Sequence, residues 1–293
     1  MKGIILAGGK GTRLYPNTQV ISKQLLPIYD KPMIYYPIAT LMEAGVSDIL
    51  LISDPSSIEK YEELLRDGSQ FGISISYKVQ LEPNGLAQAF LIGEDFIKRN
   101  RDGSAYTDSV VLILGDNLFY GSIEIPDKSK ATIFLYEVSD PERYGVAEID
   151  KKGRVKSIVE KPAKPKSNLA VTGLYLYPLD VTERVKQLVP SMRGELEITD
   201  LNNLYLQDDM LSALLLPRGV AWLDTGTPHS MLEASNFIQA IEDRTGKQIA
   251  CLEEIAFKKR LIELSILVQQ AELYKGSSYG QYLLRLAERG YDW

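Results

Sequence analysis

Short apolar runs alternate with longer amphipathic segments through the first 116 residues of the chain. Residues 49–52 and 110–114 consist of apolar side chains only, and residues 4–6 and 73–77 are two further candidate strands. A strand without a polar face is typical of a parallel sheet that is covered on both sides. The alternation therefore predicts βαβ units in an α/β fold, with a Rossmann-like open sheet and helices on both of its faces.

The clearest helical pattern follows the run at residues 49–52. Pro55 suits the first position of a helix, and Gly68 suits its end. Between them, apolar residues recur at helical spacing, namely Ile58, Tyr61, Leu64 and Leu65. We expect a helix that begins at Pro55 and carries these residues on one face.

The pattern changes after Asp116, where short strand-like runs are separated by turns rich in Pro, Gly and Lys. These runs are residues 131–138, 146–149, 155–159 and 170–177. They predict an antiparallel section added to the same sheet, whereas the pattern from Leu232 onward is mostly helical. We expect one compact domain, with an α/β core over residues 1–231 and a helical C-terminal extension over residues 232–293.

Composition limits the partners that the chain can have. Its formal net charge of -6 argues against a general nucleic-acid binder, which needs a basic surface. Cys251 is the only cysteine, so an internal disulfide is impossible and a reducing compartment is favoured. No stretch reaches the roughly 20 apolar residues that a spanning helix needs. We therefore expect a cytoplasmic protein without membrane or nucleic-acid partners.

A glycine-rich loop follows the first apolar run directly. Gly8, Gly9 and Gly11 allow a sharp turn and a close approach of a ligand to the backbone, while Lys10 and Arg13 add positive charge. Consecutive free N–H groups in such a loop can bind an anion. The spacing matches neither the Walker phosphate loop nor the dinucleotide pattern, because Gly follows the lysine and Leu stands where the third glycine belongs. The loop is a candidate phosphate site of another kind.

The segment Leu-Ala-Gly-Gly-Lys-Gly-Thr-Arg-Leu at residues 6–14 resembles the opening of the sugar nucleotidyltransferases. Further blocks similar to the family follow in the family's order over most of the chain. They are residues 22–27, 31–34, 82–89, 114–117, 140–146, 160–162, 171–175, 193–200 and 221–227. A single block is weak support, but this ordered series is specific.

Within this family, the match is to the branch that transfers a thymidylyl group from dTTP to α-D-glucose 1-phosphate. The resemblance implies a direct in-line attack on the α-phosphorus, Mg²⁺ as the metal, and release of pyrophosphate. It implies Asp116 and Asp224 as the metal ligands. The implied catalytic residues are Arg13, Lys23, Asp116, Lys161 and Asp224.

The resemblance also divides the core into a nucleotide-binding part, at about residues 1–118, and a sugar-binding part, at about residues 131–231. The implied nucleotide-binding residues are Leu6, Gly8, Gly9, Gly11, Thr12, Arg13, Lys23, Gln80, Gly85 and Asp116. The implied sugar-binding residues are Tyr144, Gly145, Glu160, Lys161, Val171 and Thr199. The resemblance also implies a homo-oligomer, namely a homotetramer.

Several of these residues have simpler interpretations when each is taken alone. Gln80 can be the polar end of a strand, Thr199 can cap a helix, and Asp116 or Asp224 can belong to a turn. His229, the only histidine, is interpreted as structural, because an ionised sugar phosphate needs no histidine base.

Two other functions stay open. UTP-dependent uridylyl transfer to glucose 1-phosphate is one, because UTP and dTTP differ by a base methyl and a ribose hydroxyl. A non-catalytic sugar-nucleotide sensor on the same fold is the other, although the joint presence of the five implied catalytic residues argues against it. The chain also departs from the family at residues 122–130, which are too short and Pro-broken for the helical stretch that contributes to an effector site in feedback-inhibited relatives.

Overall fold

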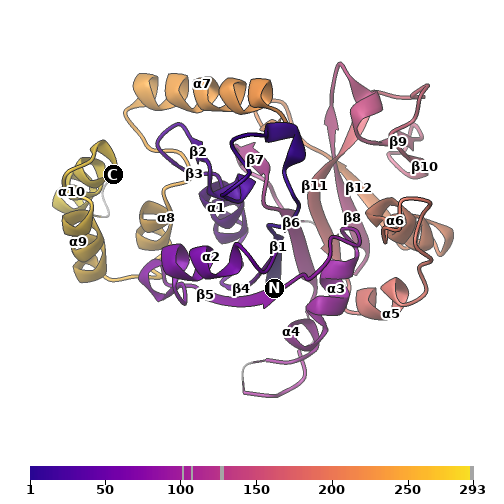
Figure 1. Ribbon diagram of the computed structural model, residues 1–293, viewed down its shortest axis with the longest axis horizontal. Coiled ribbons are helices and arrows are strands. Elements are labelled where there is room, and N and C mark those ends of the chain that lie inside the picture. Colours follow the sequence, from indigo (N-terminus) through magenta and orange to yellow (C-terminus); the bar gives the residue numbers. More distant parts are fainter. Residues whose placement is uncertain (101, 107, 126–128, 291–293) are drawn as a thin grey trace.

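The structure, a computed structural model, describes residues 1–100, 102–106, 108–125 and 129–290. Its centre is a mixed β-sheet that runs through the middle of the molecule (Figure 1). Four strands form a parallel section in the order β6-β1-β4-β5. They are β1 (Lys2–Leu6), β4 (Asp48–Ser53), β5 (Ser74–Val79) and β6 (Val110–Leu114). All four coincide with the apolar runs, so this prediction is confirmed.

The rest of the sheet is mainly antiparallel, as the later runs predict. Strand β11 pairs with β6 on one side and with β8 and β9 beyond it, and β9 pairs with β10. The bounds are β8 (Ala131–Glu137), β9 (Gly145–Ile149), β10 (Val155–Glu160) and β11 (Leu169–Tyr177). Strand β12 (Leu211–Leu215), which the sequence pattern did not reveal, lies parallel to β8.

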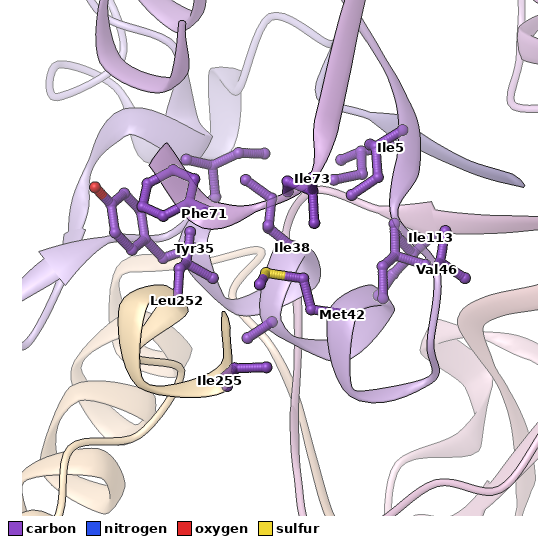
Figure 2. Packing of buried hydrophobic residues seen from close by; sticks show 14 of the residues in the cluster. Ile5, Tyr35, Ile38, Met42, Val46, Phe71, Ile73, Ile113, Leu252 and Ile255 are labelled. Carbon is purple, nitrogen blue, oxygen red and sulfur yellow. The ribbon is translucent and has the colours of Figure 1, made fainter. Parts of the chain in front are cut away.

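Helices cover both faces of the sheet. Neighbouring residues of each buried strand point to opposite sides, so each strand contributes side chains to both hydrophobic clusters. Ile5 and Leu51 face one hydrophobic cluster, while Ile4 and Leu50 face the other. Figure 2 shows part of the first cluster, where Ile38 and Met42 of a helix pack near Leu252 and Ile255 of a second helix. The predicted fold class is confirmed.

The helices of the first face are α1 (Tyr35–Glu43), α2 (Ile58–Leu65) and α8 (Leu252–Lys258). Those of the second face are α3 (Gln88–Ile92), α4 (Glu94–Lys98), α5 (Val181–Val185) and α6 (Ile198–Gln207).

The end of the chain is helical. Helix α7 (Pro228–Thr245) begins with a capping box between Thr227 and Ser230, and α9 (Leu264–Leu273) and α10 (Ser278–Arg289) follow α8. In Figure 1, α9 and α10 lie at the end of the molecule opposite β9 and β10. Among the residues that the structure describes, no helix combines the length and the hydropathy needed to cross a membrane.

Helix α2 begins three residues later than Pro55, where the sequence pattern placed its start. The Asp54 carboxylate accepts a hydrogen bond from the backbone N–H of Ser56 at 3.0 Å, so this segment forms a turn before the helix. A local side-chain hydrogen bond of this kind competes with helix formation.

Two small sheets lie beside the main sheet and position the site. Strand β7 (Asn117–Tyr120) pairs with β13 (Ala221–Asp224), and β2 (Pro27–Ile28) pairs with β3 (Lys31–Pro32).

Candidate functional site

The glycine loop and Asp116 leave the sheet at the same edge. Strands β1 and β6 are parallel neighbours, and Leu6 lies opposite Leu114 at their carboxyl ends. The N–H of Gly115 donates to the carbonyl of Leu6 at 2.9 Å, which extends the pairing up to the point where both segments turn away. Open α/β sheets bind their ligands at this edge. Strand pairing alone therefore brings residues 8–13 next to Asp116.

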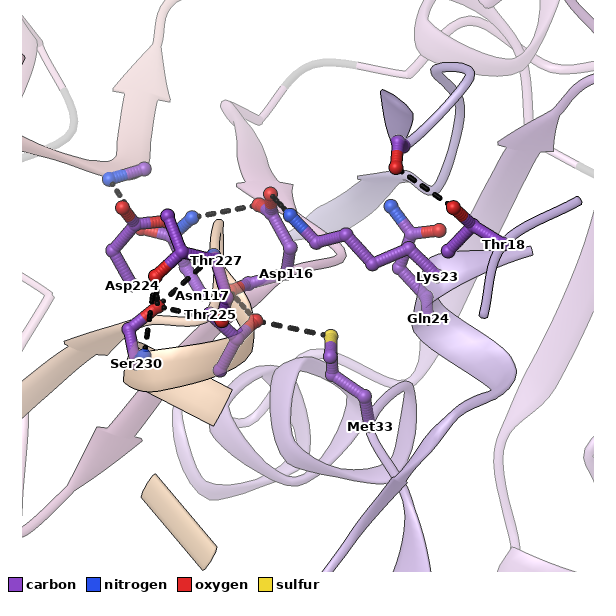
Figure 3. A network of polar contacts seen from close by, with 12 residues as sticks. Thr18, Lys23, Gln24, Met33, Asp116, Asn117, Asp224, Thr225, Thr227 and Ser230 are labelled. Atoms are coloured by element: carbon purple, nitrogen blue, oxygen red, sulfur yellow. Dashed lines mark hydrogen bonds and ion pairs between the residues drawn. The ribbon is translucent and has the colours of Figure 1, made fainter. Parts of the chain in front are cut away.

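Asp116 is held by two neighbours, one on each carboxylate oxygen (Figure 3). The ammonium group of Lys23 forms an ion pair with Oδ2, and the amide of Asn117 donates to Oδ1 at 2.9 Å. Lys23 belongs to a 3₁₀ turn at Lys23–Leu25, and its side chain is only 8% exposed. The structure thus places a nearly buried cation directly against the predicted metal ligand.

Asp224 reaches the same place through the pairing of β7 with β13. In this pairing Asp224 lies opposite Asn117, the residue after Asp116. The next residue, Thr225, donates its hydroxyl to the carbonyl oxygen of Asp116 at 2.8 Å. Two carboxylates that are 108 positions apart in the sequence are therefore fixed on adjacent backbones.

The two carboxylates have opposite electrostatic environments. Burial tends to raise the pKa of Asp116, but the Lys23 ammonium and the hydrogen bonds from Lys23 and Asn117 outweigh it and hold this pKa below its usual range. Burial raises the pKa of Asp224, and the Asp116 carboxylate raises it further against the opposing effect of Lys23, Arg143 and Arg13. Asp116 is thus stably ionised, whereas ionised Asp224 is short of compensating charge.

Two arginines lie beside Asp224. Arg143 places Nη2 3.3 Å from Oδ2 of Asp224. A Cβ atom at Gly226 would lie 3.0 Å from Nη2 of Arg13 and 3.2 Å from both carboxylate oxygens of Asp224. The lack of a side chain at Gly226 therefore leaves room for Arg13 next to the carboxylate.

The predicted site residues gather around three cavities, which share lining residues and so adjoin one another. A cavity of about 210 Å³ is lined by the glycine loop, and it shares Arg13 and Asp116 with a cavity of about 390 Å³. It shares Gly9 and Lys23 with a third cavity, of about 420 Å³, that contains Gln80.

Each cavity brings together a different set of predicted residues. The 210 Å³ cavity contains Gly8, Gly9, Gly11, Thr12, Arg13, Lys23 and Asp116. The 390 Å³ cavity contains Arg13, Asp116, Tyr144, Gly145, Glu160, Lys161, Val171, Thr199 and Asp224.

The 390 Å³ cavity has an ordered polar wall. Thr199, in the first turn of α6, donates to Oε2 of Glu160 at 2.8 Å, so its side chain faces the cavity residues. A Cβ atom at Gly145 would lie 3.3 Å from the same Oε2. Lys161 follows with a backbone φ of 42°, a left-handed conformation that is uncommon outside glycine and is often found at functional sites.

Gln80 and Gly85 have different surroundings. Gln80 donates to the side chain of Gln88 at 2.7 Å and lines the 420 Å³ cavity. Gly85 has φ of 102°, and a Cβ atom there would lie 2.4 Å from the carbonyl oxygen of Leu196. The space that a side chain at Gly85 would take is therefore occupied by the backbone of Leu196. Leu6 is buried in β1 and supports the loop from below.

Arg143 and Arg193 line the 390 Å³ cavity, although the sequence pattern gave neither of them a role. Both lie in blocks that resemble the family, and a cation in such a block is the signal that could have identified them. Asn117 was also missed, because its importance depends on contacts with distant segments. His229 is largely exposed on α7, 3.2 Å from Glu233.

Metal binding has to be judged from the donor set. Within the described ranges, no group of three or more His, Cys, Asp or Glu side chains could hold a metal ion. Mg²⁺ usually binds one or two carboxylates together with water and substrate phosphates, rather than a cage made of protein alone. Asp116 and Asp224, which both line the 390 Å³ cavity, fit this mode.

A further cavity, of about 470 Å³, lies between α1, β7 and the segment that joins α7 to α8. Ser122 and Ile123, at the start of the segment that departs from the family, line it together with Gly121. Residues 126–128 of that segment lie outside the described residues, and 122–125 contain no helix, as expected.

The family model for nucleotidyl transferases matches residues 2–241 of the chain. A glucose-1-phosphate thymidylyltransferase of Neisseria meningitidis is 53% identical over 296 residues, which covers 99% of this chain and 100% of that protein. The chain also resembles proteins of known structure.

The first is a Bacillus anthracis protein assigned to the glucose-1-phosphate thymidylyltransferases, in complex with sucrose. It has a TM-score of 0.73 and 42% identity, over 81% of this chain and 94% of that chain. The second is a UDP-glucose pyrophosphorylase complexed with UDP-glucose, with a TM-score of 0.67 and 28% identity, over 82% of this chain and 98% of that chain.

Proposed function

Because the chain belongs to the nucleotidyl transferase family, and within it to the glucose-1-phosphate thymidylyltransferases, we propose that it transfers a thymidylyl group from dTTP to α-D-glucose 1-phosphate with Mg²⁺ as cofactor. The products are dTDP-glucose and pyrophosphate. The observation that carries this proposal is the position of Asp116 and Asp224: both line the 390 Å³ cavity, and Asp116 also lines the cavity of the glycine loop. The chain is accordingly a nucleotidyltransferase.

The triphosphate is assigned to the 210 Å³ cavity. The backbone N–H groups of the glycine loop and the charges of Arg13 and Lys23 can bind phosphate oxygens in a protein whose net charge is negative. Asp116 and Asp224 would hold Mg²⁺, which supplies positive charge to the α-phosphate when it is bound. We assign this step to the nucleotide-binding part, at about residues 1–118.

The sugar phosphate is assigned to the 390 Å³ cavity, in the part at about residues 131–231. Lys161 would bind its phosphate, and Glu160, oriented by Thr199, would accept hydrogen bonds from sugar hydroxyls. Arg143 and Arg193 are further candidate phosphate contacts. The backbone at Gly145 and Val171, together with Tyr144, would complete the sugar pocket.

Catalysis then requires alignment rather than a protein nucleophile. An oxygen of the sugar phosphate is already ionised and attacks the α-phosphorus, while pyrophosphate leaves on the opposite side. Holding two reactants in line can contribute roughly 7–11 kcal/mol in favourable cases. Arg13, at the junction of the two cavities, is placed to stabilise the charge that develops on the leaving pyrophosphate.

UTP-dependent transfer is the alternative that a specific observation favours, since the chain resembles a UDP-glucose pyrophosphorylase complexed with UDP-glucose. The carboxamide of Gln80 in the 420 Å³ cavity can bind the edge of either thymine or uracil. A strict preference for dTTP must therefore come from contacts with the base methyl or from the absence of a ribose hydroxyl.

The test is a pyrophosphate-release assay that crosses dTTP, UTP, CTP, ATP and GTP with several sugar 1-phosphates, with and without Mg²⁺. We expect the highest kcat/KM for dTTP with glucose 1-phosphate, and no turnover without a divalent cation. Asp224→Asn should be inactive, whereas Asp95→Asn, which changes an exposed acid on α4, should retain full activity. Preference for UTP would select the alternative, and no turnover with any pair would favour the non-catalytic sensor.

A cytoplasmic location and assembly into a homotetramer remain predictions. The support for a reducing compartment is the single free cysteine, Cys251, which is buried. Size-exclusion chromatography with light scattering would measure the oligomeric state directly.

A further inference from the structure

We propose that Arg143 is the resident cation of Asp224: its guanidinium pairs with this carboxylate and offsets part of its charge until a divalent cation displaces it. The proposal rests on the proposed function, because it takes Asp224 as a metal ligand. It adds a residue that must move when the metal binds, and it predicts a competition that metal titration can measure.

The contact joins two segments that are far apart in the sequence. Arg143 ends a 3₁₀ turn at Pro141–Arg143, just before β9, while Asp224 ends β13. Nη2 of Arg143 lies 3.3 Å from Oδ2 of Asp224, and Nη1 lies 2.6 Å from Oδ2 of Asp140 on its own turn. The guanidinium therefore bridges one local carboxylate and one carboxylate of the metal site.

Asp224 needs such a cation when no metal is bound. Its side chain is 17% exposed, and it lies near the ionised Asp116. Lys23 is already paired with Asp116. Arg13 also lies nearby, but Arg143 adds the guanidinium that contacts Asp224 directly at 3.3 Å, which lowers the cost of a negative charge in this largely buried place.

The geometry also indicates that the ion pair between Arg143 and Asp224 can be broken easily. Its contact with Asp140 is shorter than its contact with Asp224, and it reaches Asp224 through one nitrogen only, without the bidentate arrangement of a strong pair. Its side chain is 39% exposed, so it can shift without opening the core. When Asp224 is taken by a metal, Asp140 still keeps the guanidinium paired at the edge of the 390 Å³ cavity.

The two contacts of Arg143 predict changes of opposite sign in metal affinity. Arg143→Gln removes the competing cation, so Mn²⁺ should bind the free protein about two- to fivefold more tightly, the upper part of the range for a partly exposed ion pair. Asp140→Asn releases Arg143 from its local partner, so Arg143 should hold Asp224 more fully and Mn²⁺ should bind more weakly. In the double variant, the effect of Asp140→Asn should largely disappear.

Free Mn²⁺ measured by electron paramagnetic resonance gives these affinities without substrate and without turnover. Arg154→Gln is a matched control, because Arg154 pairs with Asp150 on a remote turn in the same way. Circular dichroism and thermal unfolding confirm that each variant is folded. Asp224→Asn identifies the part of Mn²⁺ binding that belongs to this site.

Two failures can be told apart. If Mn²⁺ binding depends on Asp224 but Arg143→Gln leaves it unchanged or weakens it, the role of Arg143 is wrong and the metal site stands. Tighter binding in Asp140→Asn would also overturn the proposal. If wild type and Asp224→Asn bind Mn²⁺ equally, both the metal site and the role of Arg143 are refuted.

Discussion

Asn117 fixes the orientation of Asp116, and the other contacts of the Asn117 side chain allow its amide only one orientation. The side-chain oxygen of Asn117 accepts from the backbone N–H of Gly173 at 3.0 Å and from the indole of Trp222 at 2.6 Å. Both partners can only donate, so the amide nitrogen must point the other way, toward Oδ1 of Asp116 at 2.9 Å. One buried side chain thus joins β11, β13 and the candidate metal ligand.

Substitution of Asn117 should affect stability and the site separately. In Asn117→Ala, the donors of Gly173 and Trp222 lose their acceptor in a buried place, so the free energy of unfolding should fall by about 1–3 kcal/mol. Asn117→Asp keeps an acceptor for both donors but turns a second carboxylate oxygen toward Asp116. We expect a smaller loss of stability, and a raised pKa of Asp116 that moves the acidic limb of the pH–rate profile to higher pH.

Urea unfolding and pH–rate profiles of the two variants measure these effects. If Asn117→Ala were as stable as wild type, the buried hydrogen bonds of Asn117 would contribute little to the free energy of unfolding.

Asp224→Asn should make the protein more stable while it abolishes turnover. The pKa of Asp224 is raised in the folded protein by burial and by Asp116, so ionised Asp224 lowers the free energy of unfolding near pH 7. This loss of stability grows as pH rises through the raised pKa of the folded protein. It vanishes below the pKa of the unfolded chain, where the carboxyl is protonated in both states. Without metal, the variant should gain on the order of 1 kcal/mol at pH 7 and nothing near pH 3.

Urea unfolding at both pH values, with EDTA present, tests this expectation. A variant less stable than wild type at pH 7 would show that the neighbouring cations already compensate the charge.

Gly85 should tolerate no side chain, because Leu196 lies close to it and because its own backbone has a positive φ. Gly85→Ala would place Cβ 2.4 Å from the carbonyl oxygen of Leu196, in a backbone conformation that also disfavours alanine. Gly153→Ala is the matched control, since Gly153 has φ of 77° and a Cβ atom there would meet no atom of the described residues within 4 Å. We expect about 1 kcal/mol of destabilisation in the control and clearly more in Gly85→Ala.

Equal losses in the two alanine variants, measured by thermal unfolding, would mean that the contact with Leu196 adjusts freely. The difference between them therefore measures how firmly the segment after β5 is held against the segment before α6.

The sequence pattern is informative wherever local chemistry decides the structure. The apolar runs at β1 and β6 required burial on both faces, and the rule that ligands bind at strand ends then placed Asp116 beside the glycine loop. The start of α2 was misjudged because the Asp54 side chain forms a competing turn, which hydrophobic spacing does not reveal. Local rules therefore succeeded for elements and failed at a boundary.

The remaining contacts of the site depend on pairing between distant segments. Asp224 meets Asp116 because β13 pairs with β7, and no periodicity in either strand specifies that partner. Arg143, just before β9, meets Asp224 at the end of β13 through a contact between segments 81 positions apart. The resemblance to a family could supply the names of the two carboxylates, but not the arginine or the asparagine that surround them.

Substitution of Thr199 should weaken the binding of the sugar substrate alone. Thr199→Val keeps the shape of the side chain but removes the hydrogen bond that orients Glu160, at 2.8 Å. The loss of one hydrogen bond to a charged group corresponds to roughly tenfold or more in affinity, so KM for glucose 1-phosphate should rise by about this factor while KM for dTTP changes little. Thr132→Val is the matched control, because the buried hydroxyl of Thr132 has no hydrogen-bond partner among the described residues. Initial-rate kinetics with each substrate varied in turn would decide the matter: an equal rise in both KM values would place Thr199 outside a pocket that is specific for the sugar.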